Sequence, residues 1–145
     1  MSPASLPSVA QFTSPRGRKL SLLKYVMIGI GGAAGAIARY LLGNYVGSRL
    51  GFRFPYGTFV INISGCFLVG VSMALLARSV ASPSWRYLIP IGFIGAYTTF
   101  STFEYETLRA VQEGQLATGL LNVGLSVVTG FVAVWLGDVL GKVWV

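Results

Sequence analysis

Four long apolar stretches with almost no charge dominate the pattern of the chain. They run from about Lys24 to Gly43, from Phe54 to Ala77, from near Trp85 to about Val111, and from Gly114 to Gly137. Each approaches the ~20 residues that a helix needs to cross a ~30 Å hydrocarbon core. Because the apolar residues are continuous and do not alternate with polar ones, they predict helices and not the strands of a barrel. We expect an all-α membrane protein with four transmembrane helices.

The first twenty residues have a different composition. They hold three of the six prolines, several serines, no acidic residue and the basic residues Arg16, Arg18 and Lys19. This composition favours a disordered arm that lies against anionic lipid, and it also fits an organellar transit peptide. We therefore predict a basic arm over residues 1–20 and one transmembrane domain over residues 21–145.

Composition excludes most soluble functions. Only 10% of the 145 residues are charged, against about 25% in soluble proteins, and the mean hydropathy is +0.69. With no histidine and a single cysteine, Cys66, we expect no histidine-centred triad, no zinc site of the usual type and no enzyme. The net charge of +7 beside such long apolar stretches favours an anionic membrane surface or a small anion over nucleic acid.

The basic residues do not define one orientation. With four spans both termini share a side, which carries Arg16, Arg18, Lys19, Lys24, Arg78, Arg86 and Lys142; the other side carries Arg39, Arg49, Arg53 and Arg109. Without the three charges of the arm, the two sides carry four each. The positive-inside rule then gives the core no direction. Either the arm decides the orientation, or the chain inserts both ways up and forms an antiparallel dimer.

Neutral polar residues line the second and fourth stretches at helical spacing. Thr58, Asn62, Gly65 and Ser72 share one face, and Asn122, Ser126 and Thr129 share another. An amide deep in an apolar stretch needs a partner. Asn62 either donates to a permeating anion, or caps a neighbouring helix break or joins two helices. The serine and threonine hydroxyls could equally bond their own helix.

The third stretch predicts a helix that breaks in the membrane. Gly95 followed by Thr98 and Thr99, behind Pro90 and Gly92, is a poor helix former. Carbonyl groups freed at such a break need a partner, and a bound cation is one. Beyond the break, Phe100 and Phe103 stand one turn apart with Glu106 adjoining; lipid contact or core packing also explains such a pair.

Two further features concern packing and charge. Gly31 and Gly35, and Gly32 and Ala36, form small-residue pairs that permit close helix contact, either inside one chain or between copies. Arg39 is the one cation deep in a stretch, although its place near the end of the stretch allows it to snorkel to the interface.

These residues resemble the fluoride channel (Fluc/CrcB) family. Three motifs carry the resemblance: Gly31-Gly32-Ala33-Ala34-Gly35-Ala36-Ile37-Ala38-Arg39-Tyr40; Gly57-Thr58 with Asn62, Gly65 and Gly70; and Gly95-x-x-Thr98-Thr99-Phe100-Ser101-Thr102-Phe103 followed by Glu106. They occur in order on the expected spans and cover about residues 24–145.

The resemblance implies an antiparallel, dual-topology homodimer in a bacterial inner membrane that exports fluoride passively. It implies that Asn62, Phe100 and Phe103 line the pore, and that the Gly95 and Thr98 carbonyls hold a structural sodium ion at the dimer interface. We expect Thr58, Arg39 and Glu106 to belong to the same pathway. Ser126 matches the polar track of the fourth span, where Asn122 replaces a frequent tyrosine and Thr129 could substitute for a hydroxyl absent at Gly130.

Two other functions fit parts of the pattern. A small proton-coupled drug exporter also has four spans, but it needs an ionisable group in the membrane. The first stretch has Arg39 and no acid, which leaves only Glu104 and Glu106, late in the third stretch. A membrane scaffold without transport would use the polar residues solely to join helices.

Overall fold

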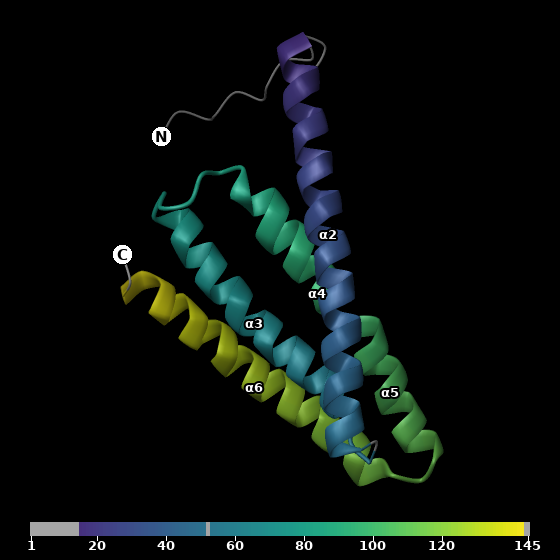
Figure 1. Ribbon diagram of the computed structural model, residues 1–145. Coiled ribbons are helices and arrows are strands. Elements are labelled where there is room, and N and C mark those ends of the chain that lie inside the picture. Colours follow the sequence, from purple (N-terminus) through teal and green to yellow (C-terminus); the bar gives the residue numbers. More distant parts are fainter. Residues whose placement is uncertain (1–14, 52, 144–145) are drawn as a thin grey trace, which may run out of the picture.

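The structure is a computed structural model that describes residues 15–51 and 53–143, all of whose regular elements are helical. In chain order they are α2 (Pro15–Leu50), α3 (Tyr56–Ala77), the π-helix η1 (Tyr87–Ile94), α4 (Gly95–Tyr97), α5 (Phe100–Gln112) and α6 (Leu116–Val143). Figure 1 shows α2 and the segment from η1 to α5 running in one direction, while α3 and α6 return in the other. The elements therefore alternate in direction across the molecule.

Three of these helices are long and apolar enough to span a membrane: Leu22–Leu50, Tyr56–Ala77 and Leu116–Val143. The prediction of an α-helical, multi-pass membrane protein is confirmed. The third predicted stretch is not one helix but the sequence η1, α4 and α5. Because α2 begins at Pro15, the last residues of the predicted arm are helical, and residues 1–14 lie outside the described part of the chain.

The first helix is longer than its apolar pattern suggests. The first apolar stretch ends at about Gly43, whereas α2 continues to Leu50. Glycine is tolerated in membrane helices, and Val46 beyond Gly43 is buried, which continues the packed face. The helix ends where Gly51 adopts a φ of 77°, a conformation that glycine reaches without steric cost.

Close backbone contacts at glycines hold the helices together. A Cβ atom at Gly137 would collide with the carbonyl oxygen of Phe67 on α3. Gly31 and Gly35 on α2 lie equally close to the backbone of Leu88 and Phe93. The small-residue pair at Gly31 and Gly35 is therefore used inside the chain, against η1.

The η1 helix owes its wide turns to Pro90. Proline has no N–H to donate and its ring pushes against the preceding turn, and a π-helical segment accommodates such a defect. Further along, the Phe93 and Tyr97 rings stack with centroids 5.6 Å apart. The Tyr97 hydroxyl lies 2.7 Å from Ser64 Oγ on α3, which ties this segment to the core.

Gly137→Ala should destabilise the protein by about 1–3 kcal/mol, because the new methyl group must push α6 away from α3. Gly124→Ala on the same helix is the matched control, since a Cβ atom there meets nothing within 4 Å. Alanine also favours helix by about 1 kcal/mol over glycine. Thermal unfolding of each purified full-length variant in detergent measures its unfolding midpoint. Equal midpoints for the two variants would contradict the packing described.

Candidate functional site at the helix break

The third apolar segment breaks at two threonines. Thr98 has φ −75° and ψ 156°, and Thr99 has φ −149° and ψ 110°, so both are extended between α4 and α5. Thr99 caps α5, because its Oγ1 accepts a hydrogen bond from the Thr102 amide at 3.3 Å. Gly95 itself is helical, with φ −61° and ψ −33°. The predicted break is present, but the capping threonine and not a special glycine conformation sets it.

Asn62 holds the break from the neighbouring helix α3. Its Oδ1 accepts a hydrogen bond from the Thr99 amide at 2.8 Å, and its Nδ2 donates to the Thr99 carbonyl at 3.1 Å. The amide group thus replaces the backbone partners that a continuous helix would have supplied. Of the two roles that the sequence allows for Asn62, capping a neighbouring break is the one seen directly.

Carbonyl groups of the turn before the break lose their helical donors. In a continuous α-helix the Thr99 amide would donate to the Gly95 carbonyl, and the Thr102 amide to the Thr98 carbonyl. Here the Thr99 amide donates to Asn62 and the Thr102 amide donates to the Thr99 side chain. The Gly95 and Thr98 carbonyls are therefore two of the carbonyls at the break whose usual donors are directed elsewhere.

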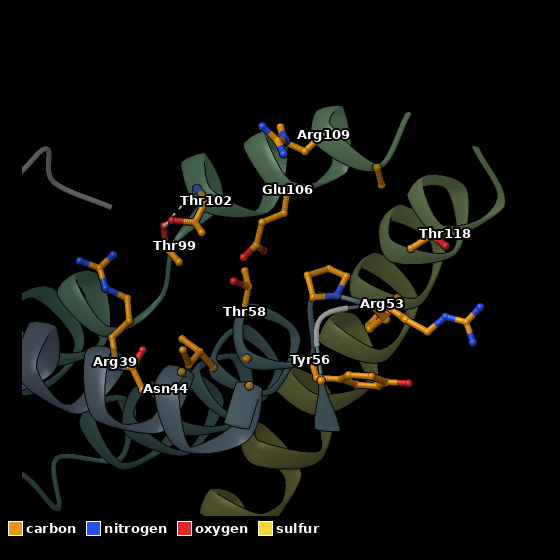
Figure 2. Close-up of a pocket in the computed structure, with 18 of the residues that line it drawn as sticks. Arg39, Asn44, Arg53, Tyr56, Thr58, Thr99, Thr102, Glu106, Arg109 and Thr118 are labelled. Carbon is orange, nitrogen blue, oxygen red and sulfur yellow. Dashed lines mark hydrogen bonds between the residues drawn. The ribbon is translucent and has the colours of Figure 1, made fainter. Parts of the chain in front are cut away.

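A polar cavity of about 680 Å³ opens on one side of the break (Figure 2). Polar and charged residues from α2, α3, α5 and α6 and from the segments at their ends contribute to it, among them Arg39, Asn44, Arg53, Thr58, Thr99, Thr102, Glu106, Arg109, Glu113 and Thr118. The Glu106 carboxylate points toward Thr58 (Figure 2). Its Oε2 is buried without a hydrogen-bond partner in the described part of the chain.

The charge of the polar cavity is positive on balance. Arg109 is paired with Glu113 at 2.6 Å and is exposed. Arg39 and Arg53 also line the cavity, where Glu106 is the remaining acid. A concave surface with excess positive charge raises the local concentration of anions.

An apolar groove of about 470 Å³ lies on the other side of the break. Its lining includes Asn62, Cys66, Gly95, Thr98, Thr99, Phe100, Phe103 and Ser126. The Phe100 and Phe103 rings are 5.8 Å apart at 38°. Phe103 is buried, but Phe100 is 73% exposed, so the groove is open at the surface of the single chain. Thr99 lines both the cavity and the groove, which makes the break their meeting point.

The polar residues of α6 differ in their placement. Ser126 lines the groove. Asn122 is 1% exposed and donates to Thr107 Oγ1 on α5 at 2.8 Å, while its Oδ1 accepts from Ser126 Oγ at 3.4 Å. The Thr129 hydroxyl donates to the Leu125 carbonyl of its own helix. Asn122 and Thr129 are not among the residues that line the cavity or the groove.

The structure gathers most of the predicted site residues in two adjoining places. Arg39, Thr58 and Glu106 share the cavity, and the groove takes Asn62, Gly95, Thr98, Phe100, Phe103 and Ser126. Sequence reasoning did not assign Thr99, which joins the two, although a threonine directly before a helix is a capping signal. It also missed Thr107, which lies one turn beyond Phe103 and bonds its carbonyl.

A conventional metal centre does not fit these residues. Within residues 15–51 and 53–143, no three His, Cys, Asp or Glu side chains gather in a way that could hold a metal ion. A cation at the break would have to be held by carbonyl oxygens, and such ligands suit hard ions.

The arrangement defines a class: an integral, multi-pass helical membrane protein whose broken helix joins a positively charged cavity to a groove lined by aromatic residues. The chain belongs to the CrcB family, described as "CrcB-like protein, Camphor Resistance (CrcB)", which matches residues 26–138.

Several bacterial relatives carry the name "Fluoride-specific ion channel FluC". The one from Acidobacterium capsulatum is 58% identical over 121 residues, covering 83% of this chain and 97% of the relative. The one from Solibacter usitatus is 51% identical, covering 83% and 99%. The one from Geotalea daltonii is 47% identical over 113 residues, covering 77% and 91%.

Asn62→Leu should lower the free energy of unfolding by about 1–3 kcal/mol, because the buried Thr99 amide and carbonyl lose their partner. Ser72→Ala on the same helix is the control, since that hydroxyl bonds only the Leu68 carbonyl of its own helix; we expect a change within about 0.5 kcal/mol. Denaturation of the full chain in detergent measures both. An Asn62→Leu protein as stable as Ser72→Ala would show that the break does not depend on Asn62.

Proposed function

We propose that this protein is a passive, fluoride-selective channel that lowers cytoplasmic fluoride across a bacterial inner membrane. The observation that carries the proposal is the break at Thr98 and Thr99, where a positively charged cavity meets a groove of neutral donors and aromatic rings. The name that its relatives carry supports fluoride as the permeant ion.

Fluoride is small and strongly hydrated, so its pathway must replace water with closely spaced donors that still release it. Arg39 and Arg53 draw the anion into the cavity. At the break, Asn62 uses one N–H for the Thr99 carbonyl, and a primary amide has a second N–H for the ion. Phe100 and Phe103 can face the anion with their electropositive ring edges.

The remaining pathway residues have supporting roles. The Ser126 hydroxyl continues the groove, and Asn122 orients it by bonding both Ser126 and Thr107. The Glu106 carboxyl group points toward Thr58, and we assign both residues to the wall of the pathway. That Thr129 belongs to the pathway stays a prediction, which rests on its spacing from Ser126.

The pathway is completed by a second, antiparallel copy of the chain, and the segment from η1 to α5 is the fourth span of each copy. Phe100 is 73% exposed and the groove has no outer wall in one chain. Gly95 is also exposed, and a Cβ atom there would meet only the Pro90 carbonyl oxygen at 3.7 Å. A partner backbone could therefore approach Gly95 closely. The balanced charge of the core supports insertion in both orientations.

A sodium ion lies on the two-fold axis of this dimer in our proposal. The Gly95 and Thr98 carbonyls have lost their helical donors, and two copies would supply four such oxygens. Oxygen ligands without a carboxylate suit a monovalent ion, since a divalent one would remain under-compensated. The ion, when bound, cross-links the two subunits.

The drug-exporter alternative is not favoured. The spanning part of α2, Leu22–Leu50, carries no acidic residue that could couple transport to protons. Glu104 is exposed on α5, and Glu106 is turned toward Thr58.

Liposomes that contain the purified protein and are loaded with fluoride should empty when a potassium ionophore clamps the voltage, whereas chloride-loaded liposomes should not. A fluoride electrode and a chloride electrode measure the two fluxes. The flux should follow the fluoride gradient and ignore imposed proton or sodium gradients, because a passive channel couples the movement of no second ion to that of fluoride. Comparable chloride release would refute selectivity, and flux driven by a proton gradient would restore the exporter.

Asn62→Asp should reduce fluoride flux by roughly a hundredfold or more, because a fixed negative charge near the ion in a low dielectric opposes its passage. The variant keeps the shape of the side chain and its acceptor for the Thr99 amide. Asn44→Asp, in the wide cavity that Arg39 and Arg53 also line, is the charge-matched control and should retain most of the flux. Equal flux in the two variants would exclude Asn62 from the pathway.

Insertion in both orientations should leave each loop labelled about half from either side of the membrane. Ser82→Cys and Gln115→Cys, placed in loops at opposite ends of the molecule, are each tested with Cys66→Ser. A membrane-impermeant maleimide added to intact cells and then to lysed cells measures the two fractions. If one loop were labelled completely in intact cells and the other loop were not labelled at all, the protein would insert in a single orientation.

A further inference from the structure

Two basic side chains converge on one aromatic ring at the end of the molecule where α2 begins. Lys24 Nζ lies 5.3 Å from the centroid of the Tyr87 ring, and Arg86 Cζ lies 5.9 Å from the same centroid. Lys24 belongs to α2, whereas Arg86 directly precedes η1, so the fold brings them together from distant parts of the chain. We name these three residues the Lys24–Arg86–Tyr87 cluster.

The positive charge of this cluster is not balanced by an acid. In the described residues the ion pairs are Arg109–Glu113 and Lys142–Asp138, and neither involves the cluster. Both Lys24 and Arg86 are exposed. The ring attracts each cation, but two like charges held beside one ring repel each other. An anion between them would remove that repulsion.

The position of the cluster fits the headgroup layer of a membrane. Lys24 is two residues from Leu22, where the apolar span of α2 starts, and Arg86 directly precedes the uncharged stretch from Tyr87 to Phe103. Trp85 and Tyr25 are 49% and 71% exposed beside these cations, as is typical of aromatic residues at the membrane interface. Basic side chains at this depth reach lipid phosphates.

We propose that the Lys24–Arg86–Tyr87 cluster binds the phosphate diester of an anionic phospholipid. Arg86 supplies a planar fork of donors that matches two phosphate oxygens, and Lys24 supplies a compact charge to the same group. The Tyr87 ring holds both cations in place. The exposed rings of Trp85 and Tyr25 contact the start of the acyl chains, which a free phosphate ion does not have. The inference does not depend on which ion the protein conducts.

Native mass spectrometry of the purified full chain in detergent, titrated with phosphatidylglycerol or phosphatidylcholine, tests the proposal. We expect saturable binding of phosphatidylglycerol in preference to phosphatidylcholine. Lys24→Gln and Arg86→Gln should each weaken that binding by roughly fivefold, since a basic residue near the membrane surface contributes about that factor. Fluoride flux of both variants should stay at the wild-type level, which shows that they fold.

Lys142→Gln is the matched control, because it removes the same charge from a lysine that is already paired with Asp138. Its phosphatidylglycerol binding should equal that of the wild type. An equal loss in all three variants would overturn the proposal in favour of diffuse attraction. Unchanged binding in Lys24→Gln and Arg86→Gln would overturn it as well. Displacement of the lipid by millimolar inorganic phosphate would identify a free phosphate site instead.

Discussion

The pair of hydrogen bonds between Asn62 and the Thr99 backbone is the interaction on which the rest of the structure depends. A broken helix in a membrane exposes backbone groups that water cannot reach, and each unsatisfied one is costly. Asn62 satisfies the Thr99 amide and carbonyl together, so the chain can be extended at Thr98 and Thr99 without that penalty. The same bonds direct the Thr99 amide away from the Gly95 carbonyl, which leaves an oxygen available for another partner.

The geometry around this pair follows from close packing elsewhere. Gly31 and Gly35 let η1 lie against α2, and Gly137 lets α6 lie against α3. Before the break η1 packs against α2, and after it α5 packs against α6. The polar cavity and the apolar groove then meet at Thr99. An anion drawn in by positive charge therefore arrives where neutral donors and aromatic rings begin.

Much of this arrangement could be predicted from the sequence, and the misses have physical causes. Three of the four apolar stretches correspond to helices long and apolar enough to span a membrane. Asn62, Phe103 and Ser126, predicted as pathway residues, line one groove beside the break, and their role in a pathway stays a prediction. The first apolar stretch ends at Gly43, but the helix continues to Leu50, because Val46 is buried and extends the packed face. Gly95 was expected to distort the backbone, but it is helical, and Thr99 sets the break. Pairings between distant residues, such as Asn122 with Thr107, leave no local pattern.

Carbonyl NMR of the protein in lipid bilayers tests the central claim most directly. Thr98-Thr99 is the only Thr-Thr pair in the chain, so labelling threonine with ¹³C at the carbonyl and ¹⁵N at the amide selects the Thr98 carbonyl bonded to the Thr99 nitrogen. If the break frees this carbonyl for a cation, its chemical shift should change when sodium is replaced by N-methylglucamine, and Asn62→Leu should abolish the response. A shift that is the same with and without sodium in the wild-type protein would contradict the account.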